Sequence, residues 1–127
     1  MYLLDTSVVL TYALNPKRLG PRTRRIIRNP SRLQVSSVSI AEIFVKQMLG
    51  KIRLQSPIAA TASSFGLTPL SFDLAMAEEI STLTGMVGHD PFDRMITATA
   101  KATGVKLITS DRQLLNLGFD WILDSYS

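Results

Sequence analysis

The 127-residue chain contains no cysteine, so disulfides and thiolate metal ligands are excluded and a reducing compartment is permitted. Its single histidine, His89, would have to serve any Ser-His-Asp arrangement alone, and no G-x-S-x-G motif accompanies it. A P-loop and a dinucleotide-binding glycine motif are also missing. These absences argue against the common nucleophilic and nucleotide-dependent chemistries, and we expect His89 to be a loop or RNA-contacting residue.

Long apolar runs are missing too, because no uninterrupted stretch reaches the roughly 18 residues of a membrane span. The first 14 residues are apolar, but they include Asp5 and lack a basic leader, which is untypical of a signal peptide. We therefore expect a cytoplasmic protein without a membrane segment. The composition, 46% hydrophobic and 19% charged, is that of a globular chain, and the length predicts a single domain over residues 1–127.

Acidic residues are scarce at the start of the chain, where Asp5 is the only one among the first 32 residues. Seven of the 14 lysines and arginines fall within residues 17–32, so the first 32 residues carry a net charge of +6 and the remainder −2. Such a basic block suits a polyanion, although a solvated helix or a site for an acidic protein are alternatives. The residues expected to hold a nucleic-acid backbone are Arg22, Arg25 and Arg28, together with Arg94.

Short apolar segments alternate with helical patterns along the whole chain. Strands are expected at residues 2–4, 33–36, 67–70, 106–109 and 121–123, and helices at residues 8–14, 21–29, 39–49, 56–65, 73–83, 91–103 and 111–117. This alternation predicts an α/β fold, namely a three-layer α/β/α sandwich with a mostly parallel sheet of four or five strands.

Two carboxylates follow expected strands. Asp5 comes directly after the strand at residues 2–4, and Asp111 comes after the strand at residues 106–109. Parallel strands place their carboxyl ends at one edge of the sheet, where open α/β proteins bind their ligands. Each residue alone is also explained as a helix cap, so the shared edge is what suggests a site.

Glu42 is the only acidic residue between positions 6 and 72, and it lies inside the apolar helical segment Ser39–Val45. An ionised carboxylate among such neighbours is costly unless it is paired or binds a metal. The alternative is an exposed glutamate on the outer face of that helix. Because few residues of the segment are polar, we favour a buried Glu42.

The segment from Asp90 contains two more acidic residues. Asp90 is expected to cap the helix at residues 91–103, which places Asp93 in the first turn, where the helix dipole favours a negative charge. Thr97 and Ala100 continue the Asp93 face and are small, so this helix can approach the sheet. The alternative for Asp93 is a surface residue that only stabilises the helix.

Carboxylates that converge repel one another, and a divalent cation resolves this repulsion. Mg²⁺ and Mn²⁺ prefer oxygen ligands, can activate a bound water and can stabilise charge on a phosphodiester. We expect Asp5, Asp93 and Asp111 to hold the ion or its waters, Glu42 to hold a second ion or position the attacking water, and Asp90 to be a further candidate ligand. Hydroxyl groups are expected to orient these carboxylates, those of Thr6, Ser7, Thr109 and Ser110.

Four segments resemble, in the same order, the motif blocks of PIN-domain ribonucleases, and above all those of VapC-type toxins from bacterial toxin–antitoxin pairs. They are Leu3–Val9, Ser39–Ile43, Asp90–Ala98 and Leu107–Asp111. Each block alone is a weak signal, but four in order over nearly the whole chain form a strong one. Ser7 departs from the pattern, since asparagine is frequent there in the family.

The resemblance implies a Mg²⁺- or Mn²⁺-dependent endoribonuclease that acts on RNA. It assigns the acidic quartet to Asp5, Glu42, Asp93 and Asp111, supported by Thr109. It further implies a homodimer and a small antitoxin protein that blocks the site. An RNA-processing nuclease without an antitoxin and a non-catalytic RNA-binding module remain as alternatives.

Overall fold

The first strand of the chain lies at the centre of the sheet. In the computed structural model, which describes residues 1–127, β1 (Tyr2–Leu4) pairs in parallel with β2 (Leu33–Ser36) on one side and with β4 (Lys106–Thr109) on the other. The outer strands β3 (Thr68–Leu70) and β5 (Ile122–Asp124) complete the order β3-β2-β1-β4-β5, and every pairing is parallel. The predicted parallel sheet is therefore confirmed, and it has five strands.

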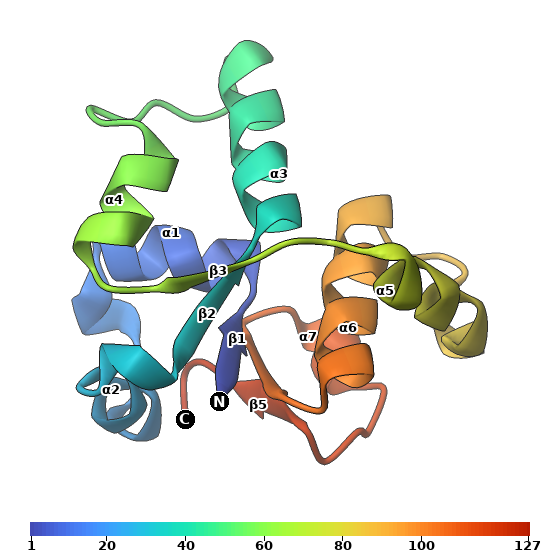
Figure 1. The fold of residues 1–127 in the computed structure, drawn as a ribbon. Coiled ribbons are helices and arrows are strands. Elements are labelled where there is room, and N and C mark those ends of the chain that lie inside the picture. The colour runs from blue at the N-terminus through green and yellow to red at the C-terminus, as the bar shows by residue number, and fades with distance from the viewer.

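Helices connect the strands and cover both faces of the sheet (Figure 1). The α-helices are α1 (Thr6–Leu14), α2 (Pro21–Ile27), α3 (Ser37–Met48), α4 (Ile58–Ser64), α5 (Leu74–Glu79), α6 (Pro91–Thr103) and α7 (Arg112–Leu115). Short 3-10 turns lie at Pro16–Arg18, Pro30–Arg32, Ile80–Thr82 and Thr84–Met86. This arrangement confirms the three-layer α/β/α sandwich. None of these helices has the length and apolar character needed to cross a membrane.

The side chains of each strand alternate between two apolar layers. Leu4 and Ile108 belong to a buried cluster with residues of α1, α3 and α4. Leu3 and Leu107, one position away, belong to a second cluster with residues of α6 and α7. Both faces of the short sheet are thus buried, which explains why its central strands are continuous apolar runs.

Side-chain caps explain why two helices begin earlier than predicted. The helix expected at residues 8–14 begins two residues earlier, because Asp5 Oδ1 accepts a hydrogen bond from the Thr6 N–H. The helix expected at residues 39–49 begins at Ser37, because the Ser36 hydroxyl accepts from the Val38 N–H. The helix expected at residues 73–83 ends at Glu79 and continues as a 3-10 turn.

Candidate active site

A cavity of about 460 Å³ opens at the carboxyl end of the strands, between α1, α3 and α6. Five carboxylates line it, those of Asp5, Glu42, Asp90, Asp93 and Asp111. The structure therefore brings together all four acidic residues that were expected to form a site, and Asp90 with them.

Asp5 serves both as a helix cap and as a pocket residue. It follows β1, and its backbone N–H donates to the Ile108 carbonyl of β4 at 2.9 Å. Its Oδ1 accepts from the Thr6 N–H at 2.8 Å, and its Oδ2 accepts from the Thr109 hydroxyl at 2.6 Å. The side chain is buried, and this burial raises the pKa of Asp5 despite both hydrogen bonds, with the charges of Glu42 and Asp111 adding to the increase.

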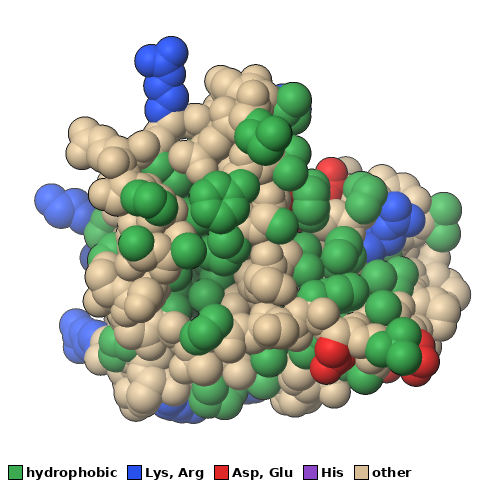
Figure 2. Space-filling model, turned by 45° about the horizontal axis from the view of Figure 1, so that its top comes forward, with side chains coloured by type: hydrophobic (Ala, Val, Ile, Leu, Met, Phe, Trp, Pro, Cys, Tyr) green, Lys and Arg blue, Asp and Glu red, His purple; other side chains and the backbone are tan.

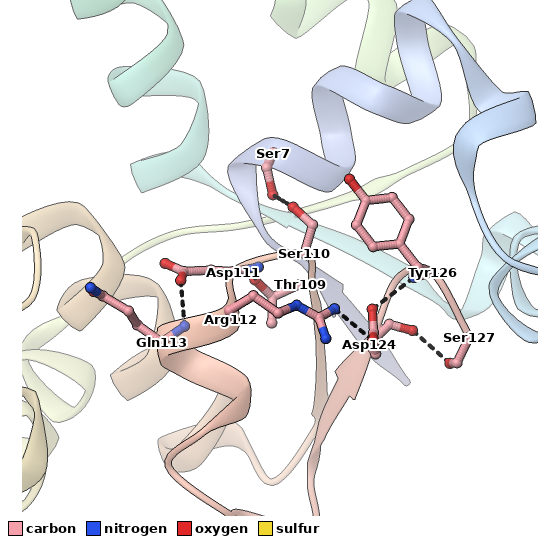
Figure 3. A network of polar contacts seen from close by, with 9 residues as sticks. All are labelled: Ser7, Thr109, Ser110, Asp111, Arg112, Gln113, Asp124, Tyr126 and Ser127. Atoms are coloured by element: carbon pink, nitrogen blue, oxygen red, sulfur yellow. Dashed lines mark hydrogen bonds and ion pairs between the residues drawn. The ribbon is translucent and has the colours of Figure 1, made fainter.

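Thr109 links two of the carboxylate positions through one hydroxyl group. The hydroxyl donates to Asp5 and accepts from the Asp111 N–H at 3.0 Å. Asp111 in turn caps α7, since its Oδ1 accepts from the Gln113 N–H at 2.8 Å (Figure 3). This chain of contacts joins the end of β1 to the start of α7. Thr109 therefore contacts the carboxylate and the backbone that its predicted supporting role requires.

The other predicted hydroxyl groups also contact the pocket. The Ser7 and Ser110 hydroxyls lie 2.9 Å apart and join the first turn of α1 to the loop after β4 (Figure 3). The Thr6 hydroxyl donates to Glu42 Oε1 at 2.7 Å and lies 3.0 Å from the Ser39 hydroxyl, which can donate to it. These contacts hold α1 against α3 and against the carboxyl end of β4.

Glu42 is buried, so the exposed alternative is wrong, and both of its carboxylate oxygens have partners. Oε1 accepts from Thr6, and Oε2 lies 2.8 Å from the ammonium group of Lys46. Lys46 and Lys51 both line the pocket and were missed in the sequence. The spacing of Lys46, four residues after Glu42 on one helix, was the signal that could have identified the pair.

Asp93 differs from the other carboxylates because no protein group forms a hydrogen bond or ion pair with its side chain. Asp90 caps α6 through the Phe92 N–H at 2.8 Å, as predicted, and Asp93 follows in the first turn. The Asp93 carboxylate accepts no hydrogen bond and forms no ion pair, and its residue is only partly exposed. Burial, followed by the charges of Asp5 and the other pocket carboxylates, raises the pKa of Asp93 from 3.8 to about 7.

The residues expected to contact RNA lie outside this pocket. Arg22 and Arg25 are exposed on α2 and Arg28 is exposed at its C-cap. This helix packs beside the end of the sheet where the strands begin (Figure 1). Arg94 is next to Asp93 on α6 but does not line the pocket. His89 does not line it either, and its buried Nδ1 has no hydrogen-bond partner.

The pocket offers carboxylate oxygens and no sulfur or imidazole ligand, and one of its carboxylates is unpartnered. This set of donors fits a hard divalent cation. As the side chains stand, however, no group of three is placed to hold an ion between them. The hydrogen bonds explain this, since both oxygens of Asp5 and Glu42 and one oxygen of Asp111 face protein donors. Mg²⁺ usually keeps several waters and one or two carboxylates, so coordination partly through water suits this geometry.

Known proteins resemble this chain in sequence and in fold. The chain is 29% identical over 119 residues to Ribonuclease VapC22 of Mycobacterium tuberculosis (strain ATCC 25618 / H37Rv), covering 88% of each chain. It superposes on a toxin–antitoxin complex from Klebsiella pneumoniae with a TM-score of 0.69 and 17% identity, covering 100% of this chain and 99% of that one. For DNA-bound VapBC from Salmonella typhimurium the TM-score is 0.70 and the identity 22%, covering 97% and 96%.

At these identities the solved structures establish a shared fold and no more. A family model, that of the PIN domain, matches residues 2–120. The match includes every carboxylate of the pocket and the strands β1, β2, β3 and β4, and it ends just before β5. Since it spans nearly the whole sequence, this chain belongs to the PIN-domain family.

Proposed function

We propose that this chain is a divalent-cation-dependent endoribonuclease and the toxin of a toxin–antitoxin pair. The observation that carries the proposal is the unpartnered Asp93 carboxylate beside four others in one cavity. A partly buried carboxylate among like charges is unfavourable for folding, and such groups are typical of catalytic and metal-binding sites. RNA as the substrate is supported by the relative VapC22, which is a ribonuclease.

In this proposal, Asp93 holds the ion with Asp5 and Asp111, directly or through its waters, and Asp90 at the same pocket is a further candidate ligand. When bound, Mg²⁺ or Mn²⁺ supplies acidity to a water and neutralises charge on the phosphodiester. Glu42, kept in place by Thr6, orients the attacking water. The hydroxyl groups that fix these carboxylates are those of Thr6, Ser7, Thr109 and Ser110.

The purified protein is expected to cleave single-stranded RNA in Mg²⁺ or Mn²⁺, to lose cleavage in excess EDTA and to regain it when Mn²⁺ is restored. Gel analysis of a labelled RNA measures cleavage, and circular dichroism in EDTA checks that the fold persists without metal. Cleavage that continues in EDTA would contradict metal dependence. RNA binding without cleavage in any divalent cation would favour the non-catalytic RNA-binding module.

We further propose that the basic surface of α2 holds the RNA backbone. None of the seven lysines and arginines in residues 17–32 forms an ion pair, so their charge is available to phosphates. Arg28 also lines a second cavity, together with Lys17, Arg24 and Tyr12. Because this surface lies at the other end of the sheet from the carboxylates, an RNA that uses both must extend across the domain.

The double variant Arg25→Gln/Arg28→Gln is expected to weaken RNA binding at low salt and to flatten its salt dependence. Each lost phosphate contact removes about 0.7 from the slope of log K against log salt for a single strand, so the slope should fall by about 1.4. Fluorescence anisotropy in EDTA measures this without cleavage. The matched control is Arg53→Gln/Lys106→Gln, which removes the same charge from exposed positions elsewhere; an equal change there would refute a specific role for α2.

An antitoxin partner is supported by the structural neighbours, two of which are a toxin–antitoxin complex and a DNA-bound VapBC. The second half of α3 exposes Phe44, Val45 and Met48, and Leu49 is exposed at its C-cap. The face of the molecule in Figure 2 carries many apolar and few charged side chains. An apolar area of this kind is typical of a protein interface. We propose that an antitoxin covers the α3 area and the adjoining pocket, and that the chain forms a homodimer.

A further inference from the structure

Lys46 forms the only ion pair made by any carboxylate of the pocket. Its ammonium group lies 2.8 Å from Glu42 Oε2, while Glu42 Oε1 accepts the Thr6 hydroxyl at 2.7 Å. Each oxygen of Glu42 therefore has one protein donor, whereas the Asp93 carboxylate has none. The pocket has two different ends, a Glu42 end that already holds a cation and an Asp93 end that does not.

The cationic charge at the Glu42 end is permanent at neutral pH. The hydrogen bond to Glu42 raises the pKa of Lys46, and the negative charges of Glu42, Asp90 and Asp93 raise it further despite partial burial. Lys46 therefore acts on carboxylates of α6 as well as on its own helix. Lys51 lines the same pocket but pairs with no carboxylate, so the two lysines differ in role.

We infer that Lys46 is a positioning residue that takes the place of a second cation at Glu42, so that the pocket holds a single divalent ion at its Asp93 end. This inference rests on the proposed function, because it presumes that the pocket binds a divalent ion.

Burial explains why Glu42 needs a cation of its own. Only 6% of Glu42 is exposed, and a carboxylate in such surroundings must be paired, protonated or bound to metal. Lys46 meets this need from one helical turn away, where the backbone of α3 keeps it within reach. A divalent ion at Glu42 would have to displace this ammonium group, whereas an ion at Asp93 displaces nothing.

Calorimetric titration with Mn²⁺ in the absence of RNA tests the inference through stoichiometry and affinity. The wild-type protein is expected to bind one ion. Lys46→Met keeps the aliphatic length but removes the charge, so it should bind Mn²⁺ about three- to tenfold more tightly and accept a second ion. Lys46→Arg should bind one ion like the wild type. A thermal melt of each variant checks folding, because Lys46→Met leaves the buried Glu42 carboxylate without its counter-ion until a metal binds.

Two further variants separate pairing from general charge. Lys51→Met removes a positive charge from the same pocket without breaking an ion pair, and it should keep one ion with a smaller gain in affinity. Glu42→Gln should also keep one ion, within about threefold of wild-type affinity, because Glu42 is not a ligand. An equal gain in Lys51→Met, or loss of the ion in Glu42→Gln, would overturn the inference.

The number of Mn²⁺ ions bound per chain distinguishes a failure of this inference from a failure of the proposed function. Two ions per chain would overturn the role of Lys46 and leave the proposed nuclease intact. One ion in both the wild type and Lys46→Met, with equal affinity, would have the same meaning. No Mn²⁺ binding at millimolar concentration would overturn both this inference and the metal dependence on which it rests.

Discussion

Asp93→Asn is expected to lower RNA cleavage by about 10³-fold or more while the protein stays folded, a loss of about 4 kcal/mol of transition-state stabilisation. Activity and stability are expected to respond differently because the Asp93 side chain contributes a charge to the pocket but no hydrogen bond or ion pair to the fold. Its carboxylate accepts no hydrogen bond and forms no ion pair. Asparagine keeps its shape and removes only the charge.

The same substitution is expected to raise stability at high pH in the absence of metal. The pKa of Asp93 in the folded protein, about 7, lies above its usual value of 3.8. The folded state therefore binds the proton more tightly, and the stability that this confers is complete below pH 4 and is lost as the pH rises to about 7. The variant escapes that loss. It forfeits only the helix-dipole interaction, of about 0.3–1 kcal/mol, which is smaller.

Urea denaturation in EDTA between pH 4 and pH 8 measures the stability of the variant and the wild type. A cleavage assay at pH 8 measures the loss of activity. The variant should gain on the wild type as the pH rises, and the two should converge near pH 4. Asp73→Asn is the matched control, since Asp73 lies outside the pocket and caps α5 through the Met76 N–H, a contact that asparagine keeps, so this change should spare cleavage and change stability little. Full cleavage by Asp93→Asn would contradict the proposed site.

Local signals in the sequence were sufficient for the parts of the fold that short-range chemistry decides. Pro91 and Gly104 bracket α6 at the predicted residues, with Asp90 as its cap. The alternation of strands and helices predicted parallel pairing, and this pairing alone brings Asp5 beside the loop that follows β4. The burial of Glu42 followed from its apolar neighbours.

Features that depend on long-range packing could not be predicted in this way. The position of α2 is one, because the start of this basic helix is held by the end of the chain: the Gly20 N–H donates to the Ser125 carbonyl and the Thr23 N–H to the Ser127 carbonyl. Nothing within residues 17–32 indicates that contact, so the sequence could not place the arginines relative to the pocket. The Glu42–Lys46 pair lies within α3 and its spacing could have identified it, but the contact of Thr6 with Glu42 and the position of Asp93 beside them depend on how α1, α3 and α6 pack.

Thr109→Val is expected to destabilise the protein by about 2–4 kcal/mol and to slow cleavage about 10- to 100-fold. Valine matches the shape of threonine, so the buried space stays filled, but the hydroxyl is lost. That hydroxyl is fully buried, donates to Asp5 Oδ2 at 2.6 Å and accepts from the Asp111 N–H at 3.0 Å. A buried carboxylate oxygen and a partly buried backbone N–H would lose these partners.

Thr109→Ser is the matched control, because it restores the hydroxyl and removes only a methyl group, so it should recover most of the cleavage and lose only about 1 kcal/mol. Urea denaturation at pH 7 measures stability, and single-turnover cleavage measures function. A valine variant as active and stable as the serine variant would show that the bridge is unimportant. Asp93→Asn and Thr109→Val should thus both reduce cleavage but move stability in opposite directions, because Asp93 adds uncompensated charge to the pocket whereas Thr109 supplies the hydrogen bonds that let Asp5 stay buried there.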